Sequence, residues 1–392
     1  MANDLLTSTK VTREILRVAH EKATFIATTN LSYDSSYAQA GAKQGTVLKI
    51  RKPNKYTVRT GKTLAAQDTQ EESVSLTLAT QKGVDMNFST SELTMELDDF
   101  SKRVVTPATS VLLSTVEYDY ISYVTKKVWN GVGTAGTTPN SMLTFGQARA
   151  KLNFNLAPKS MDERAIQINS DAMASMVNAY SALFHDQMAI KRQYTEGFIS
   201  KNSGFDWYEN ERVWTIATGS DHTTVTVNDT AIADGDTTIT AAGGNFAEGT
   251  IFTLDGSNAV HPETKQDLGY LQQFVTTASG TTALAFSPAI YATGPKQNVT
   301  ALPANSAAIV FVGSASTSYE QHLAYHKDAF AFVTADLEMP EGVHFASRQN
   351  MDGISIRLVR QYDVNNDNMP TRLDLLHGYE AIRPEWACRV TG

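Results

Sequence analysis

The sequence RLDLLHGYEAIRPE, at residues 372–385, decides the fold more than any other stretch of this chain. Its first four residues alternate between polar and apolar side chains and a further leucine follows, which predicts a β-strand. Similar short apolar runs occur at 329–333 (AFAFV) and 354–359 (ISIRLV). We therefore expect the last part of the chain to close a sheet, in an α+β fold whose earlier part contains the helices.

The beginning of the chain predicts a helix followed by an extended excursion. Residues 9–27 place apolar side chains four apart, the spacing of an amphipathic helix. From 41 to 88 the pattern changes to alternation, which includes YTVR at 56–59. These residues predict a long two-stranded ribbon with a loose loop near 60–72. Such a ribbon cannot bury either face alone, so it needs a partner surface.

A long helix is predicted next. Pro107 is suited to the first helical position after Thr106 as the cap. Apolar side chains then recur every four residues up to about residue 130, at Leu112, Val116, Tyr120, Val124 and Val128. About 23 helical residues give a rod roughly 35 Å long.

Three further helices are expected before and after residue 217. One opens with a capping box at Thr144 (TFGQ), one spans about 171–191, and a short one covers 318–327. Between the last two, residues 217–317 carry eight acids and two bases, and no arginine occurs from 213 to 347. Short alternating runs and Gly-rich turns fill this segment. It therefore predicts an all-β barrel or sandwich inserted into a parent fold of mixed charge.

Composition excludes several classes of protein. With 392 residues, the chain is too long for one core, and it carries 33 basic and 41 acidic side chains, a net charge of −8. This balance disfavours sequence-specific nucleic-acid binding. The single cysteine, Cys388, excludes an internal disulfide framework. Neither a membrane-spanning apolar run nor the pattern of a signal peptide is seen, so we expect a protein made and kept soluble, without membrane partners.

A run of basic residues in the ribbon is the main candidate for a functional surface. No acid lies among its members, which are Lys43, Lys49, Arg51, Lys52, Lys55, Arg59 and Lys62. Acids follow soon after, at Glu92, Glu96, Asp98 and Asp99. Three interpretations remain open: a solvated hairpin, an arm that lies on acidic residues of a neighbouring subunit, or a nucleic-acid contact. The second is favoured, because phosphate binding usually uses a basic face on a basic domain.

Motifs for catalysis or cofactor binding fail in detail. TGKT at 60–63 lacks the first glycine of a phosphate-binding loop. His322 and His326, four apart on the expected helix, have the spacing for a shared metal but no third ligand nearby. The run from Asp363 to Asp374 resembles a calcium loop without its sharp-turn glycine, and we interpret it as a polar hairpin loop. We expect no catalytic, metal or cofactor-binding residues, and hence no enzyme.

The order of these parts resembles the major capsid protein of tailed bacteriophages, with the Hong Kong 97-type fold, and among its branches the phage P22 coat protein. Two stretches carry the resemblance: GY and AIRPE within residues 372–385, and NFAEGTIFTLDG at 245–256, which is similar to the start of that branch's insertion domain. The implied domains are an N-terminal arm (1–40), an extended β loop (41–90), a peripheral domain with the spine helix (91–139), the first part of an axial domain (140–216), the inserted β-barrel domain (217–317) and the closing strands (318–392).

The resemblance implies a coat protein of a virion, assembled in the host cytoplasm into the icosahedral head of a tailed, short-tailed phage. Its implied partners are other copies in pentamers and hexamers, scaffolding protein, portal protein and non-specifically enclosed double-stranded DNA. In that reading the basic run at 43–62 of one subunit meets the acids at 92–99 of the next. The alternatives are a phage tail or other virion structural protein, and a carbohydrate-active enzyme. The latter lacks paired carboxylates and clustered tryptophans.

Overall fold

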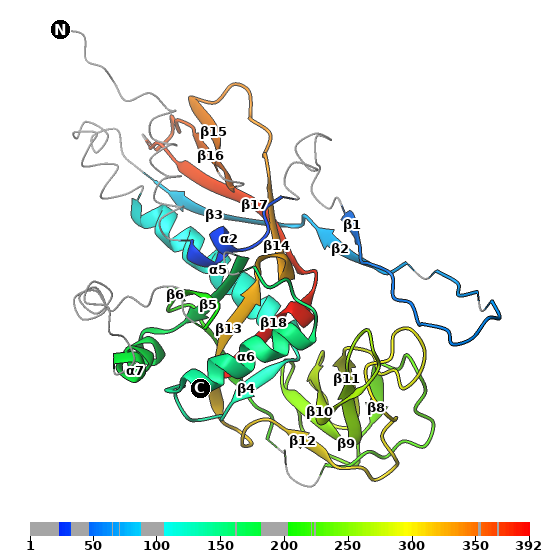
Figure 1. Cartoon of the computed structure of the whole chain (residues 1–392). Coiled ribbons are helices and arrows are strands. Elements are labelled where there is room, and N and C mark those ends of the chain that lie inside the picture. The colour runs from blue at the N-terminus through cyan, green and yellow to red at the C-terminus, as the bar shows by residue number, and fades with distance from the viewer. Residues whose placement is uncertain are drawn as a thin grey trace. The chain divides into compact units, whose positions relative to one another are not determined.

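The computed structural model describes residues 23–32, 47–64, 66–69, 71–87, 106–160, 163–181, 203–220, 222, 225–351, 354–366 and 368–392. Figure 1 shows the helices and strands along the chain, which divides into two compact units. Unit 1 comprises Met1–Ile50, Val74–Tyr120 and Phe330–Ile382, and unit 2 comprises Arg51–Ser73, Ile121–Ala329 and Arg383–Gly392. None of the helices in the described ranges is both long and apolar enough to cross a membrane.

Strand β17 is the centre of the unit 1 sheet. The order is β14-β17-β16-β15, and β3 also pairs with β17. The bounds are β3 Thr80–Met86, β14 Phe330–Ala335, β15 Phe345–Met351, β16 Ile354–Arg360 and β17 Thr371–Ala381. The three strands predicted near the end of the chain are therefore confirmed.

Steric crowding explains why residue 378, in the stretch at 372–385, is a glycine. Gly378 lies in β17 where another segment passes so closely that a Cβ would sit 2.3 Å from the carbonyl oxygen of Thr77. Any side chain there would displace backbone. Thr77 ends β2 (Ser73–Thr77), which pairs with β1 (Val47–Arg51). This close passage lets Leu76 and Leu78 join a core with Val333 and Leu376.

The long helix is confirmed as α5, Thr106–Lys127. All five positions of its predicted apolar stripe are buried. In unit 1, the ring of Tyr120 lies 4.8 Å from Phe25, 5.4 Å from Phe332 and 5.3 Å from Tyr379, measured between ring centroids. Phe25 belongs to α2 (Thr24–Thr28), which coincides with the end of the helix predicted at 9–27. The part of that predicted helix from residue 9 to residue 22 lies outside the described residues.

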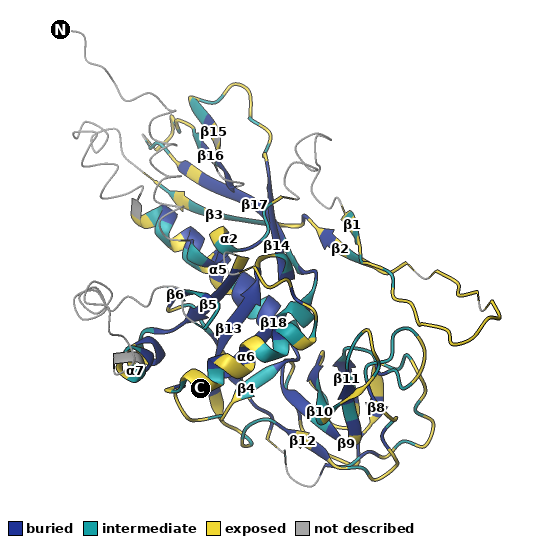
Figure 2. Cartoon of the chain, in the orientation of Figure 1, coloured by how far each residue is buried: buried dark blue, intermediate teal, exposed yellow. Residues whose placement is uncertain are grey.

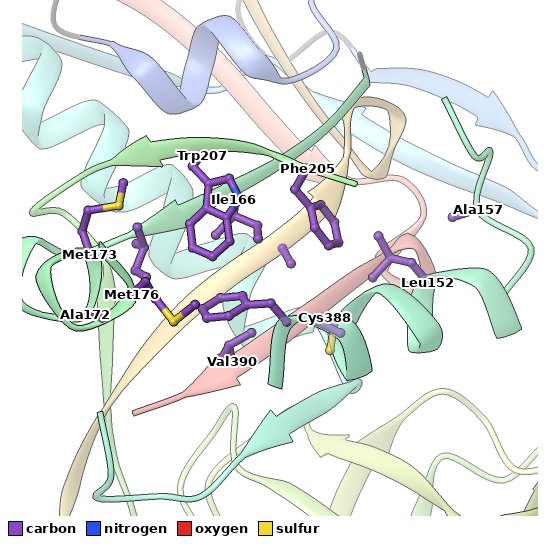
Figure 3. Close-up of a cluster of buried hydrophobic side chains, with 14 residues drawn as sticks. Leu152, Ala157, Ile166, Ala172, Met173, Met176, Phe205, Trp207, Cys388 and Val390 are labelled. Carbon is purple, nitrogen blue, oxygen red and sulfur yellow. The ribbon is translucent and has the colours of Figure 1, made fainter. Parts of the chain in front are cut away.

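Unit 2 is built on a second sheet with order β4-β18-β13-β5-β6, in which β7 also pairs with β13. Helices α6 and α7 contribute to its core, which brings Leu152, Ile166 and Trp207 together with Cys388 (Figure 3). The bounds are β4 Gly131–Gly133, α6 Met142–Phe154, β5 Arg164–Ile168, α7 Ser170–Ser181, β6 Asp206–Glu209, β7 Trp214–Ala217, β13 Ser318–His326, η4 Lys327–Ala329, η5 Pro384–Trp386 and β18 Ala387–Thr391.

Two predictions in unit 2 are wrong, one in the residue at which a helix begins and the other in the type of element. Helix α6 begins at Met142 with Ser141 as its cap, because the Ser141 side chain accepts a hydrogen bond from the Leu143 amide, so Thr144 lies inside the helix. The expected helix at 318–327 is strand β13. It pairs with β18 on one edge and with β5 and β7 on the other, and these partners override its local pattern.

The inserted segment is all-β, as expected. Its five-stranded sheet has the order β12-β9-β10-β11-β8 and closes over a core rich in phenylalanine, including Phe252, Phe274 and Phe286. The bounds are β8 Thr238–Thr240, β9 Ile251–Val260, β10 Asp267–Thr276, β11 Ala283–Ser287 and β12 Ile309–Phe311. Residues 51–64 and 66–69, by contrast, contain no strand beyond Arg51, so the strand predicted at 56–59 is wrong.

Candidate assembly surfaces

Most of the arm, residues 51–73, is coloured as exposed in Figure 2. Three large apolar side chains are among its exposed residues. Val58 is 96% exposed, Leu64 82% and Tyr56 58%. The tip is nevertheless ordered by one side chain, because the Gln67 amide accepts from the Thr57 N–H at 2.9 Å and donates to the Thr57 carbonyl at 2.6 Å. Such an apolar tip without cover is typical of a surface that binds another protein.

The predicted basic residues that the structure describes begin in β1 and continue along the outgoing leg of the arm. Lys49 is exposed in β1, and Arg51 forms an exposed ion pair with Glu71 at 3.5 Å. The Lys52 amide donates to the Glu72 carbonyl at 2.7 Å. The remaining described members of the run, Lys55, Arg59 and Lys62, are exposed.

The predicted acidic counter-surface cannot be compared with the arm in this structure. Glu92, Glu96, Asp98 and Asp99 lie outside the described residues, as does Lys43. The acids that do meet the basic run come from the returning leg of the arm, at Glu71 and Glu72. The sequence analysis did not identify Glu71 and Glu72 as partners of the basic run. Pairing the two legs of the ribbon as a hairpin would have placed residues 71–72 opposite residues 51–52.

Within unit 2, the base of the arm touches the insert. Glu72 Oε1 lies 2.5 Å from Lys296 Nζ. This hydrogen bond holds the pKa of Glu72 below its usual value, with Lys55 and Lys52 acting in the same direction, and raises the pKa of Lys296. A pocket of about 420 Å³ lies beside the pair. It is lined by Pro53, Lys55, Gln67, Asp68, Glu72, Asp234, Tyr291, Thr293, Pro295 and Lys296.

The insert is also joined to the central sheet of unit 2 by polar contacts to backbone. The Gln273 amide of β10 accepts from the Gly131 N–H at 3.0 Å and donates to the Gly131 carbonyl at 2.9 Å. A side chain at Gly131 would clash, since a Cβ there would be 2.6 Å from Ile251 Cδ1.

A fully buried arginine reinforces this junction. Arg389 of β18 donates to the Gly249 carbonyl at 2.7 Å, and burial lowers its pKa to about 9. Nearby, Lys126 pairs with Glu248 at 3.3 Å, and Lys151 lies 3.8 Å from the ring centroid of Tyr270. The insert therefore covers a charged group that would otherwise need water.

The histidine pair does not form a metal site. Because His322 and His326 lie on a strand, a separation of four residues places them about 13 Å apart along it. In the part of the chain that the structure describes, no three His, Cys, Asp or Glu side chains come together to hold a metal.

The acidic run at 363–374 is a polar turn, as we interpret it from the sequence. Asp363 accepts from the Asn365 amide and from Asn366 Nδ2, and its backbone bridges to Asn368. Asp374, the last carboxylate of the run, is instead fully buried in β17, where it binds Arg357 and Arg372. Asp367 is outside the described residues.

Comparison with known proteins identifies the family. The model of the family described as "P22 coat protein - gene protein 5" matches residues 3–392, nearly the whole chain. The chain belongs to the P22 coat protein family. It is therefore a major capsid protein, a structural component of the phage head that self-assembles into the capsid, and not an enzyme. The predicted α+β capsid fold with an inserted all-β domain is confirmed.

Several solved structures are similar to this member of the P22 coat protein family. A chain of Mycobacterium phage Che8 is 11% identical with a TM-score of 0.48, and the match covers 93% of this chain and 89% of that one. The bacteriophage PhiM1 mature capsid is 11% identical with a TM-score of 0.44, covering 88% and 81%. The CUS-3 coat protein I-domain is 30% identical with a TM-score of 0.21, covering 24% of this chain and all of that one. No curated protein matches the chain.

Proposed function

We propose that this coat protein assembles as pentamers and hexamers of a closed head, around scaffolding protein and a portal, and encloses double-stranded DNA of a short-tailed phage. Identical subunits joined by heterologous contacts close into rings, and the rings close the shell. The observation that carries this proposal is the arm, whose apolar tip is exposed in the single chain. In a shell, a neighbouring subunit supplies the missing cover.

The basic run and the acids at 92–99 are proposed to meet across that interface. Lys49, Lys55, Arg59 and Lys62 are exposed, so they are accessible to a neighbour's carboxylates. Each such pair contributes less than about 1 kcal/mol, but a shell repeats it in every subunit. The nucleic-acid interpretation is less well supported, because few aromatic side chains accompany the lysines.

The arm proposal is tested by placing a charge at the exposed tip. Val58→Asp should leave the free energy of unfolding of the free subunit within about 0.5 kcal/mol of wild type, because the side chain is exposed. It should sharply reduce the yield of shells on co-expression with scaffolding protein, since a charge would be buried at the interface. Particles are counted by negative-stain electron microscopy.

The matched control is Val364→Asp, which changes another exposed valine in the turn at 361–366. It should affect shell yield much less. Shells formed in normal number by the Val58 variant, or equal losses from both variants, would argue against the arm as the overlapping element.

The domain boundaries, with the insert at 217–317, are likewise part of the proposal. Ala217 of β7 and Ser318 of β13 are paired residues, so the two ends of the insert leave the parent sheet side by side. The Thr218 hydroxyl donates to the carbonyls of Ser314 and Thr317, at 2.6 and 2.9 Å. These contacts support one continuous insertion at this point, whose two ends a short linker can join.

Deleting 218–316 and joining the ends with a short linker should impair folding or change shell size. The physical reason is that the deletion removes the cover of Arg389 and the amide contact to Gly131. Folding is followed by circular dichroism and shell size by electron microscopy. Full-sized, stable shells from the deletion would contradict a structural role for the insert.

A further inference from the structure

The contact between the base of the arm and the insert lies within one subunit, and both of its residues belong to unit 2. We infer that the insert holds the arm of its own subunit through the Glu72–Lys296 ion pair, and so fixes the direction in which the arm is presented to a neighbouring copy of the chain. The inference rests on the proposed role of the arm. It adds a positioning surface that belongs to the insert.

The insert presents Lys296 on a stiffened loop. Lys265 Nζ donates to the carbonyls of Pro295 and Gln297, at 2.9 and 3.1 Å, on either side of Lys296. These are the only two basic residues between 217 and 317. Lys265 thus stabilises the loop, and Lys296 extends from the loop to the arm. The acidic insert therefore places a lysine at the point where the arm carries Glu72.

A second set of contacts fixes the start of the same loop. The Tyr291 amide donates to Asn298 Oδ1 at 2.8 Å, and Asn298 Nδ2 donates to the Ala289 carbonyl at 2.8 Å. The Ala292 amide donates to Asp234 Oδ1 at 2.6 Å, which ties the loop to the turn before β8. Because the loop is braced at both ends, little additional freedom is lost when Lys296 binds its partner.

On the arm, Glu72 stands where both legs are joined. Its carbonyl accepts the Lys52 amide, and the adjacent Glu71 pairs with Arg51. Holding the Glu72 side chain therefore holds the outgoing and the returning leg together. The tip beyond this point has its own brace between Thr57 and Gln67, so fixing the base restricts the orientation of the whole arm.

The contact is suited to reversible positioning rather than permanent fusion. Lys296 is 24% exposed and Glu72 48%, so water and salt reach the pair. The pocket beside it leaves the two surfaces incompletely packed. An ion pair of this kind biases the arm toward one orientation and still allows it to adjust as neighbours bind.

Charge reversal of each partner tests the inference in the unassembled full-length subunit. Glu72→Lys and Lys296→Glu should each make chymotrypsin cleave at Tyr56 about fivefold faster than in wild type, since a partly exposed pair contributes on that order. Tyr56 is a suitable reporter because it is exposed on the arm. Chymotrypsin cleaves after aromatic side chains, so the charge reversals neither create nor remove this cleavage site. The double variant, which restores opposite charges, should return the rate to near that of wild type.

The matched control is Asp255→Lys, which makes the same charge change at an exposed acid of the insert, in β9 and away from the arm. It should leave cleavage at Tyr56 within about twofold of wild type. Raising the salt concentration should accelerate cleavage of the wild type and not of the single reversals.

Assembly with scaffolding protein supplies the second readout. The two single reversals should slow shell formation, and the double variant should recover it. Unchanged cleavage in the single variants would overturn the inference, as would faster cleavage with normal assembly. Neither result would contradict the proposed role of the arm in assembly, because that role is tested by Val58→Asp. The two proposals can therefore be rejected independently.

Discussion

Lowering the pH from 6.5 to 4 should destabilise the folded chain by about 3 kcal/mol for each of two buried histidines. His322 lies in the centre of β13 and is fully buried. Neither of its ring nitrogens has a hydrogen-bond partner among the residues described. Burial lowers the pKa of His322 to about 4, because the charged imidazolium would be left without water.

His377 in β17 has a similar environment in unit 1. Its ring stacks on Phe332 and Tyr379, with centroid distances of 5.9 and 5.8 Å. Burial lowers the pKa of His377 to about 4, Lys82 acts in the same direction, and Asp119 opposes it. The pKa of His326 is also lowered by burial, although Asp328 and Glu163 oppose the shift.

The sign of the effect follows from which state binds protons first. As the pH falls through about 6.5, the unfolded chain protonates these histidines while the folded chain keeps them neutral. The stability that they contribute is therefore complete above pH 6.5 and is lost between 6.5 and 4. Urea denaturation of the free subunit, repeated at half-unit intervals of pH, measures this slope.

Single replacements assign the slope to each residue. His322→Phe and His377→Phe should each flatten the pH dependence by about 3 kcal/mol over this interval, whatever their effect at pH 7. His344→Phe makes the same replacement at an exposed histidine and is the matched control. An unchanged slope in both buried variants would show that acid acts elsewhere, and nuclear magnetic resonance titration of the histidine rings provides an independent check.

The sequence predicts the helix and the closing strands well, because their patterns have a single interpretation. Five apolar positions spaced by four over a long stretch, from Leu112 to Val128, agree only with a helix of this length. The spacing of His322 and His326 is ambiguous, since four residues is one helical turn and also two strand repeats. Their strand is determined by partners at 164–167 and 387–391, which no local pattern contains.

The assembly surface could be predicted only in part for the same reason. Exposed charge in the ribbon follows from composition, but the partner of each charge depends on register. Glu72 meets Lys296 although 224 positions separate them, and Arg389 meets the backbone of Gly249. Such contacts come from the way the insert folds against the parent sheet, and short-range periodicity carries no information about them.

Asp374→Ala should cost about 3 kcal/mol of unfolding free energy, mainly because Arg357, whose side chain is only 17% exposed, would lose the carboxylate that it pairs with. Asp374 is fully buried at the centre of the unit 1 sheet, where Arg357 Nη2 and Arg372 Nε each donate to it at 2.6 Å. The site also explains Gly83, which pairs with Asp374 across the sheet. A Cβ there would sit 2.7 Å from both Asp374 Oδ1 and the Leu373 carbonyl oxygen.

Asp85→Ala provides the control, because Asp85 also forms an ion pair with Arg372 but its carboxylate is exposed, whereas that of Asp374 is buried. Its carboxylate lies 3.9 Å from Arg372 Nε and is 82% exposed, so its removal should cost less than about 1 kcal/mol. Urea denaturation at pH 7 compares the two variants. Equal losses would mean that Asp374 is replaceable by water and that burial of the carboxylate is not what holds β16 and β17 together. A loss confined to Asp374 would show that a buried carboxylate inside the stretch RLDLLHGYEAIRPE stabilises unit 1 through its ion pairs with β16 and β17.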